Sequence, residues 1–168
     1  MPPTPSLGRR IRRTRKGGFE LRIPESERVV LRRLAEELRE MLPTGDAAVG
    51  RLFPPAYADD AEGNEEYARL MRDDLLAEHL ASVEALERTV DARRVTEDEL
   101  VAWMGAVNDL RLVLGTKLDV SEEMYDEPLD EQTPNAAQLA IFHYLGWLEE
   151  QMVEALSSSL DPAGTEDA

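Results

Sequence analysis

The stretch TEDELVAWMGAVNDLRLVLGTKL, residues 96–118, carries the clearest helical pattern in this sequence. Its apolar residues recur three or four positions apart, the spacing that keeps one stripe of an α-helix against a core. The stripe consists of Leu100, Met104, Val107, Leu110, Leu114 and Leu118. Thr96 and Glu99 match a capping box, in which each side chain satisfies a backbone N–H of the first turn. We therefore predict a helix here and expect the other segments to pack around it.

Three more long helical patterns and one short one surround this helix. The long patterns occupy residues 24–43, 65–93 and 134–156, and the short one follows Asp46. The 65–93 pattern predicts a buried stripe that includes Tyr67, Leu70 and Met71. A short link at 91–95 predicts that this helix lies antiparallel to the 96–118 helix.

Residues 11–23, IRRTRKGGFELRI, predict a β-hairpin, because glycine at 17 and 18 supplies the positive φ of a tight turn. The fold class is therefore mainly all-α, a bundle of about four to five helices with a short N-terminal β-hairpin. Residues 11–160 are predicted to form a single domain. Residues 1–10 and 161–168 are predicted to be disordered, since they are rich in proline, small and polar residues.

Composition excludes several classes of protein. The 168 residues contain no cysteine, which rules out disulfides, thiolate metal sites and cysteine nucleophiles within this chain. The start, MPPTPSLGRR, lacks the apolar run of a signal peptide, and no window approaches 18 apolar residues. We therefore expect a cytoplasmic protein with no membrane association.

The net charge of −16 is unevenly distributed along the chain. Residues 1–23 contain seven cations and a single acid, Glu20, so the remainder carries a net charge of −22. Such a short basic arm can neutralise phosphates of DNA, whereas the acidic body repels them. The candidate DNA-binding residues are Arg9, Arg10, Arg12, Arg13, Arg15 and Lys16. The alternative, that these cations pair with acids of the protein's own body, stays open.

Polar residues interrupt the two central helical patterns. If the helices pair, these residues could form a buried polar layer that fixes their register. The layer would comprise Asp73, Asp74, Asn108, Asp109 and Arg111. A metal-assisted hydrolase using the three aspartates is the weaker alternative.

No catalytic residue, metal site or cofactor is predicted. The chain lacks a phosphate-binding glycine loop and a recognisable nucleophile with a base beside it. His79 and His143 are interpreted as ordinary helix residues. The seven acids between Asp119 and Glu131 lack the spacing of a calcium loop and are interpreted as a solvated loop.

Several short motifs occur together in a fixed order. They are GFELRI at 18–23, LFPPAY at 52–57, RDDL at 72–75, NDLRLVLGT at 108–116 and YLGWL at 144–148. This combination resembles an actinobacterial family described as a domain of unknown function and encoded beside the ClpS protease adaptor. Mycobacterial members of that family are named oxidative stress transcriptional regulator AosR. The resemblance extends from about Ile11 to Leu156.

The resemblance implies a non-enzymatic regulator of the oxidative stress response. Its partner would be a sigma factor or RNA polymerase, at promoters of sulfur and redox genes, with DNA contacted through the basic arm. The alternative is a helical adaptor linked to ClpS and Clp proteolysis that does not touch DNA. Whether the protein forms a homo-oligomer stays open. Four methionines, Met41, Met71, Met104 and Met152, lie on apolar stripes and are interpreted as core residues rather than oxidant sensors.

Overall fold

The computed structural model describes residues 8–53, 63–119 and 135–158. Within these ranges the chain forms four α-helices, two short 3₁₀ helices and three short strands. In chain order they are β1 (Ile11–Arg13), β2 (Phe19–Leu21), α1 (Glu25–Met41), η1 (Leu42–Thr44), η2 (Ala47–Leu52), α2 (Gly63–Thr89), β3 (Arg94–Val95), α3 (Glu97–Leu118) and α4 (Ala136–Ser157). The predicted fold class, mainly helical with an N-terminal hairpin, is confirmed.

Helix α3 is the central element, as its sequence pattern predicted, and it contacts α1, α2, α4 and η2. Its capping box is formed: Glu99 N–H donates to Thr96 Oγ1 at 3.1 Å, and Thr96 N–H donates to Glu99 Oε1 at 2.9 Å. Because α2 and α4 both cover this helix, burial extends beyond the predicted stripe to Trp103. The Trp103 indole N–H donates to Thr89 Oγ1 at 2.6 Å, which ties α3 to the end of α2.

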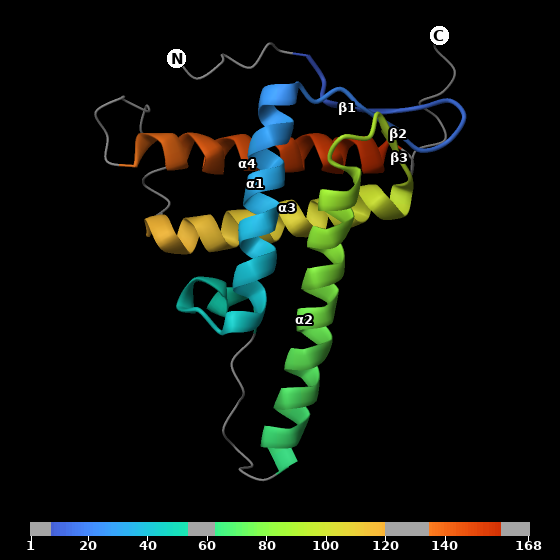
Figure 1. Ribbon diagram of the computed structural model, residues 1–168. Helices are drawn as coiled ribbons and strands as arrows, with labels where there is room; N and C mark the ends of the chain where they lie inside the picture. Colours follow the sequence, from blue (N-terminus) through green and yellow to red (C-terminus); the bar gives the residue numbers. More distant parts are fainter. Residues whose placement is uncertain (1–7, 54–62, 120–134, 159–168) are drawn as a thin grey trace.

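The helices cross in two layers (Figure 1). Helices α3 and α4 lie side by side, and α1 and α2 pack together across them. Helix α2 crosses α3 steeply, so the predicted antiparallel arrangement is wrong. A steeply crossing helix contacts its neighbour over a limited length, and the N-terminal part of α2 projects beyond the other helices. Tyr67, Leu70 and Met71, predicted to be buried, are therefore exposed.

The N-terminal hairpin is confirmed and gains a third strand. The strands form an antiparallel sheet in the order β1-β2-β3. Its inner face packs into the core through Ile11, Phe19, Leu21 and Val95, which are all buried. Gly18 has φ of +77°, and a Cβ at this position would lie 2.9 Å from the Val95 carbonyl oxygen. Glycine is thus required both by the turn and by the close approach of β3.

A buried arginine joins this sheet to the helices. Arg28 of α1 donates to the carbonyl oxygens of Ile23 at 2.7 Å and Ala92 at 3.0 Å, and also to that of Val90. Carbonyls at a helix C-terminus lack intrahelical partners, so a cation there satisfies them and complements the helix dipole. Arg28 therefore fixes the position of β3 after α2 ends at Thr89.

Several predictions fall outside the described residues. These are residues 54–57 of the LFPPAY motif, most of the acidic segment at 119–131, and residues 1–7 and 161–168 of the two ends predicted to be disordered. Asp46 accepts from Ala48 N–H at 2.8 Å and so caps η2, the short helix that the sequence predicted to follow it. Among the described helices, none combines the length and apolar character needed to cross a lipid bilayer.

Candidate nucleic-acid interface

The basic arm is part of the sheet rather than a free tail. Two of its six cations precede β1, two lie within it, and two occupy the turn before β2. Five of the six predicted DNA-binding residues are exposed: Arg9, Arg12, Arg13, Arg15 and Lys16. The backbone of the turn is held by Thr14, whose N–H donates to Gly18 O at 3.0 Å. The arm therefore presents its charges from a fixed backbone.

Arg10 is the exception, because the fold buries it. Only 5% of the residue is exposed, and its guanidinium pairs with Glu27 of α1 at 3.0 Å. It also donates to Gly8 O at 2.9 Å and lies over the Trp147 ring, 5.3 Å from the centroid. Its backbone N–H donates to Gln151 at 2.6 Å. The prediction that Arg10 contacts DNA is therefore wrong, and its role is to anchor the arm to α1 and α4.

The exposed cations of the arm are available for an external partner. Within the described residues, Arg9, Arg12, Arg15 and Lys16 take part in no ion pair. Arg13 donates to a backbone carbonyl, that of Ser158, at 3.1 Å. Neutralisation by the protein's own carboxylates, the alternative raised by the sequence, thus applies to Arg10 alone within the described part of the arm.

A buried carboxyl lies at the crossing of α2 and α3. Asp109 is 4% exposed, and its Oδ2 lies 2.6 Å from His79 Nδ1. The other ring nitrogen, Nε2, lies 3.1 Å from the carbonyl oxygen of Leu52 in η2. Burial raises the pKa of Asp109 above its usual value, and His79 opposes this shift. The pair therefore joins three elements of the core.

The predicted polar layer does not form as one unit. Asp73, Asp74 and Asn108 are exposed. Asp109 takes His79 as its partner instead of an arginine or lysine. These positions also exclude a hydrolase site that combines Asp73 and Asp74 with Asp109.

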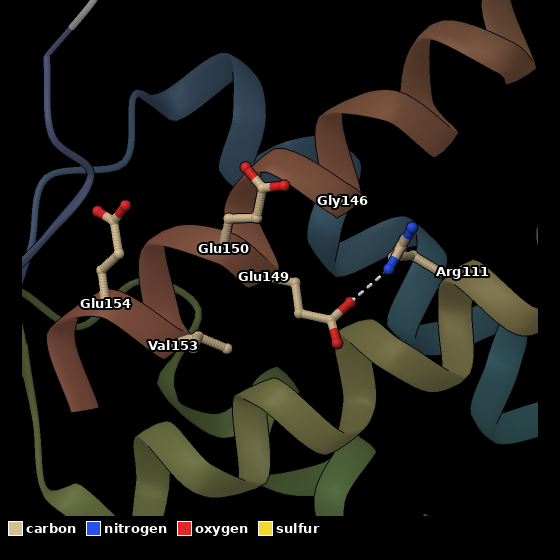
Figure 2. Close-up of a pocket in the computed structure, with 6 residues that line it drawn as sticks. All are labelled: Arg111, Gly146, Glu149, Glu150, Val153 and Glu154. Carbon is tan, nitrogen blue, oxygen red and sulfur yellow. Dashed lines mark hydrogen bonds and ion pairs between the residues drawn. The ribbon is translucent and has the colours of Figure 1, made fainter. Parts of the chain in front are cut away.

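Arg111 instead belongs to a surface hollow between α3 and α4, of about 400 Å³. Its guanidinium pairs with Glu149 at 2.8 Å and lies over the Phe142 ring. Figure 2 shows Glu149 pointing toward Arg111, whereas Glu150 and Glu154 point away from it. The carboxylates do not converge, and no cluster of three or more potential metal ligands occurs in the described ranges.

Sequence reasoning missed the partners of these charged groups. Nothing in the sequence marked His79 or Glu149 as partners, because the packing of α2 and α4 against α3 decides which side chains meet. Arg94 and its neighbour Arg93 did carry a signal. The link between α2 and α3 is short, and in it two arginines precede the β-branched Val95. This pattern favours an extended segment, which the structure shows as the edge strand β3.

Residues 8–156 match a sequence family described as Domain of unknown function (DUF2017). The chain belongs to this family. Similar proteins include the Oxidative stress regulator AosR of Mycobacterium tuberculosis and that of Mycobacterium bovis. Each is 30% identical to this chain, over 68% of this chain and 60% of its own length. No solved structure matches significantly. The predicted family resemblance is confirmed, while the genomic link to ClpS stays a prediction.

Proposed function

We propose that this protein is a non-enzymatic transcriptional regulator of the oxidative stress response that contacts DNA through the exposed cations of its N-terminal sheet. The name of its mycobacterial relatives supports the regulatory role. The observation that carries the DNA contact is the set of arm cations that no described carboxylate neutralises. Exposed arginines with fixed backbones suit phosphate groups, which guanidinium binds in a bidentate manner.

A protein partner is the second part of this proposal, with a sigma factor or RNA polymerase as its identity. Tyr67, Leu70 and Met71 are 64%, 58% and 42% exposed on the projecting part of α2. Clustered exposed apolar side chains are typical of protein interaction sites. The same surface would also serve an adaptor of Clp proteolysis, which is the alternative partner class.

The DNA contact is tested by a triple variant, Arg12→Gln, Arg15→Gln and Lys16→Gln. These changes leave the buried Ile11 and Arg10 in place, whereas deletion of residues 1–16 would remove both. We expect weaker promoter binding and a salt slope smaller by about three units. The matched control replaces three exposed arginines elsewhere, Arg33, Arg51 and Arg69. Equal binding by the test variant and the wild-type protein would contradict the proposal.

The partner class is tested by affinity capture from an actinobacterial lysate. Recovery of sigma factor and polymerase subunits supports the regulator, and recovery of Clp components supports the adaptor. A Tyr67→Ser, Leu70→Ser variant should lose the captured partner while keeping DNA affinity. Loss of both activities would instead indicate a damaged fold, which circular dichroism detects.

A further inference from the structure

We propose that the whole three-stranded sheet, including the link between α2 and α3, forms one cationic face for the phosphate backbone of duplex DNA. This inference rests on the proposed DNA contact and extends it to Arg22 and Arg94. Neither of these belongs to the basic run at residues 9–16. Arg22 directly follows β2, and Arg94 joins the face because β3 pairs with β2.

The strand register aligns three charged side chains across the sheet, one from each strand. Arg12 is opposite Glu20, and Glu20 is opposite Arg94. Cross-strand partners point to the same side of a sheet, so these three side chains share a face. That face is the outer one, since Ile11 and Leu21, the next pair along, are buried on the other. Neighbouring strands lie about 4.8 Å apart, which puts Arg12 and Arg94 about 10 Å apart.

The outer face carries an excess of positive charge. Arg13 lies opposite the buried Phe19, and Arg93 lies opposite the buried Leu21, so these two arginines belong to the other side of the sheet. Six exposed cations remain on the outer face and in the segments next to its strands: Arg9, Arg12, Arg15, Lys16, Arg22 and Arg94. Nearby carboxylates reduce this excess. Glu20 pairs with Arg22 at 3.4 Å, and Asp91 pairs with Arg32 of α1 at 2.5 Å. The acidic first turn of α3 begins two residues after β3.

The chemistry of the face favours duplex DNA over the other polyanionic partners. Every exposed large hydrophobic residue in the described ranges lies on a helix, and none lies on the sheet. A protein interface has an apolar core, which this face lacks. Single-stranded nucleic acid stacks its bases on aromatic side chains, and the sheet's aromatic residue, Phe19, is buried. Duplex phosphates require only polar, cationic contacts.

Contacts of this kind position a protein on DNA but do not read its sequence. The face would therefore supply affinity that is independent of sequence. Selection of a promoter then falls to the protein partner, which agrees with a regulator that acts together with another DNA-binding protein.

The test compares single-charge variants in binding to a duplex of about 20 base pairs over a range of salt concentrations. Arg94→Gln should weaken binding about fivefold at physiological salt and reduce the salt slope by about one. Glu20→Gln should have the opposite effect and tighten binding. Arg69→Gln is the control, because Arg69 lies about 30 Å along α2 from Thr89. Circular dichroism checks that each variant is folded.

The outcomes separate this inference from the proposed function. If the wild-type protein does not bind duplex DNA, both fail. If the triple arm variant loses affinity while Arg94→Gln and Glu20→Gln behave like Arg69→Gln, the arm contacts DNA alone and the composite face is wrong. Tighter binding to single-stranded than to duplex DNA would overturn the choice of ligand.

Discussion

The imidazole of His79 lies between two oxygen atoms, 2.6 Å from Asp109 Oδ2 and 3.1 Å from the carbonyl oxygen of Leu52. A carbonyl only accepts, so Nε2 must carry a proton to form the second bond. A second proton lies between His79 Nδ1 and Asp109 Oδ2 and makes the hydrogen bond of that contact. With both protons present, each contact of the ring has one donor and one acceptor. Without one of them, a ring nitrogen and an oxygen would face each other as two acceptors.

Removal of one member of the pair should destabilise the protein more than removal of both. His79→Leu leaves a buried carboxyl without its partner, for which we expect a loss of about 3 kcal/mol in the free energy of unfolding. The double variant His79→Leu, Asp109→Leu buries no unpaired charge and should recover part of that loss. Urea unfolding measures both, and an additive loss in the double variant would show that the two residues are not coupled.

The raised pKa of Asp109 predicts a specific pH dependence. Between the usual value of 3.8 and the raised pKa, the folded protein keeps a proton that the unfolded chain has released. Stability from this group is therefore present at low pH and declines as the pH rises through that window. The difference in unfolding free energy between the wild-type protein and Asp109→Asn should fall as the pH is raised above about 4. A difference that grows with pH would mean that the pKa is lowered.

Substitution by glutamine should affect folding stability at Arg10 and DNA binding at Arg12. Arg10→Gln breaks a buried pair with Glu27 and should cost about 3 kcal/mol of stability. Arg12→Gln alters an exposed side chain and should change stability by less than about 0.5 kcal/mol. In DNA binding only Arg12→Gln should reduce the salt slope. Thermal unfolding and a salt titration of each variant provide the measurements.

The two glycines of the hairpin turn should differ when replaced by alanine. Both have positive φ, so each substitution costs about 1 kcal/mol in backbone strain. A Cβ at Gly17 meets open space, whereas one at Gly18 lies 2.9 Å from Val95 O. Gly18→Ala should therefore cost about 2 kcal/mol or more and loosen β3. Equal melting temperatures for the two variants would contradict this close approach.

Met71 should be the most readily oxidised of the four described methionines. It is 42% exposed, whereas Met152 is fully buried and Met41 and Met104 are partly covered. Peroxide oxidises accessible thioethers to the polar sulfoxide. Peptide mass spectrometry over a peroxide time course should show Met71 oxidised well before Met152. Since Met71 adjoins Leu70, the modification should also weaken binding of the captured protein partner.

Local patterns predicted the elements of this fold well. The Thr96 capping box, the hairpin around Gly17 and Gly18, and the cap at Asp46 depend on neighbouring residues, and each is present. Which face of each helix is buried was harder to predict. In α1 the buried set is Arg28, Leu31, Ala35 and Leu38, because Arg28 binds carbonyls from distant segments that no local window includes.

In the candidate interface, too, features that depend on neighbouring residues were predicted, and features that depend on residues far away in sequence were not. Charge counting identified the basic arm, and five of its six cations are exposed. It could not separate Arg10 from Arg9 or Arg12, since their difference arises from Glu27 and Trp147, which lie far away in sequence. The angle at which α2 crosses α3 depends on the packing of ridges and grooves, so the exposure of Tyr67 and Asp73 was not encoded in helical periodicity.

The steep, uninterrupted course of α2 separates the two proposed contacts by a defined length. From Thr89, next to the sheet, to Tyr67 the helix rises about 33 Å. A partner bound to Tyr67, Leu70 and Met71 would lie roughly this distance from DNA bound at the sheet, which is comparable to about ten base pairs of duplex at about 3.4 Å each. The two proposed contacts can then be occupied at once without colliding.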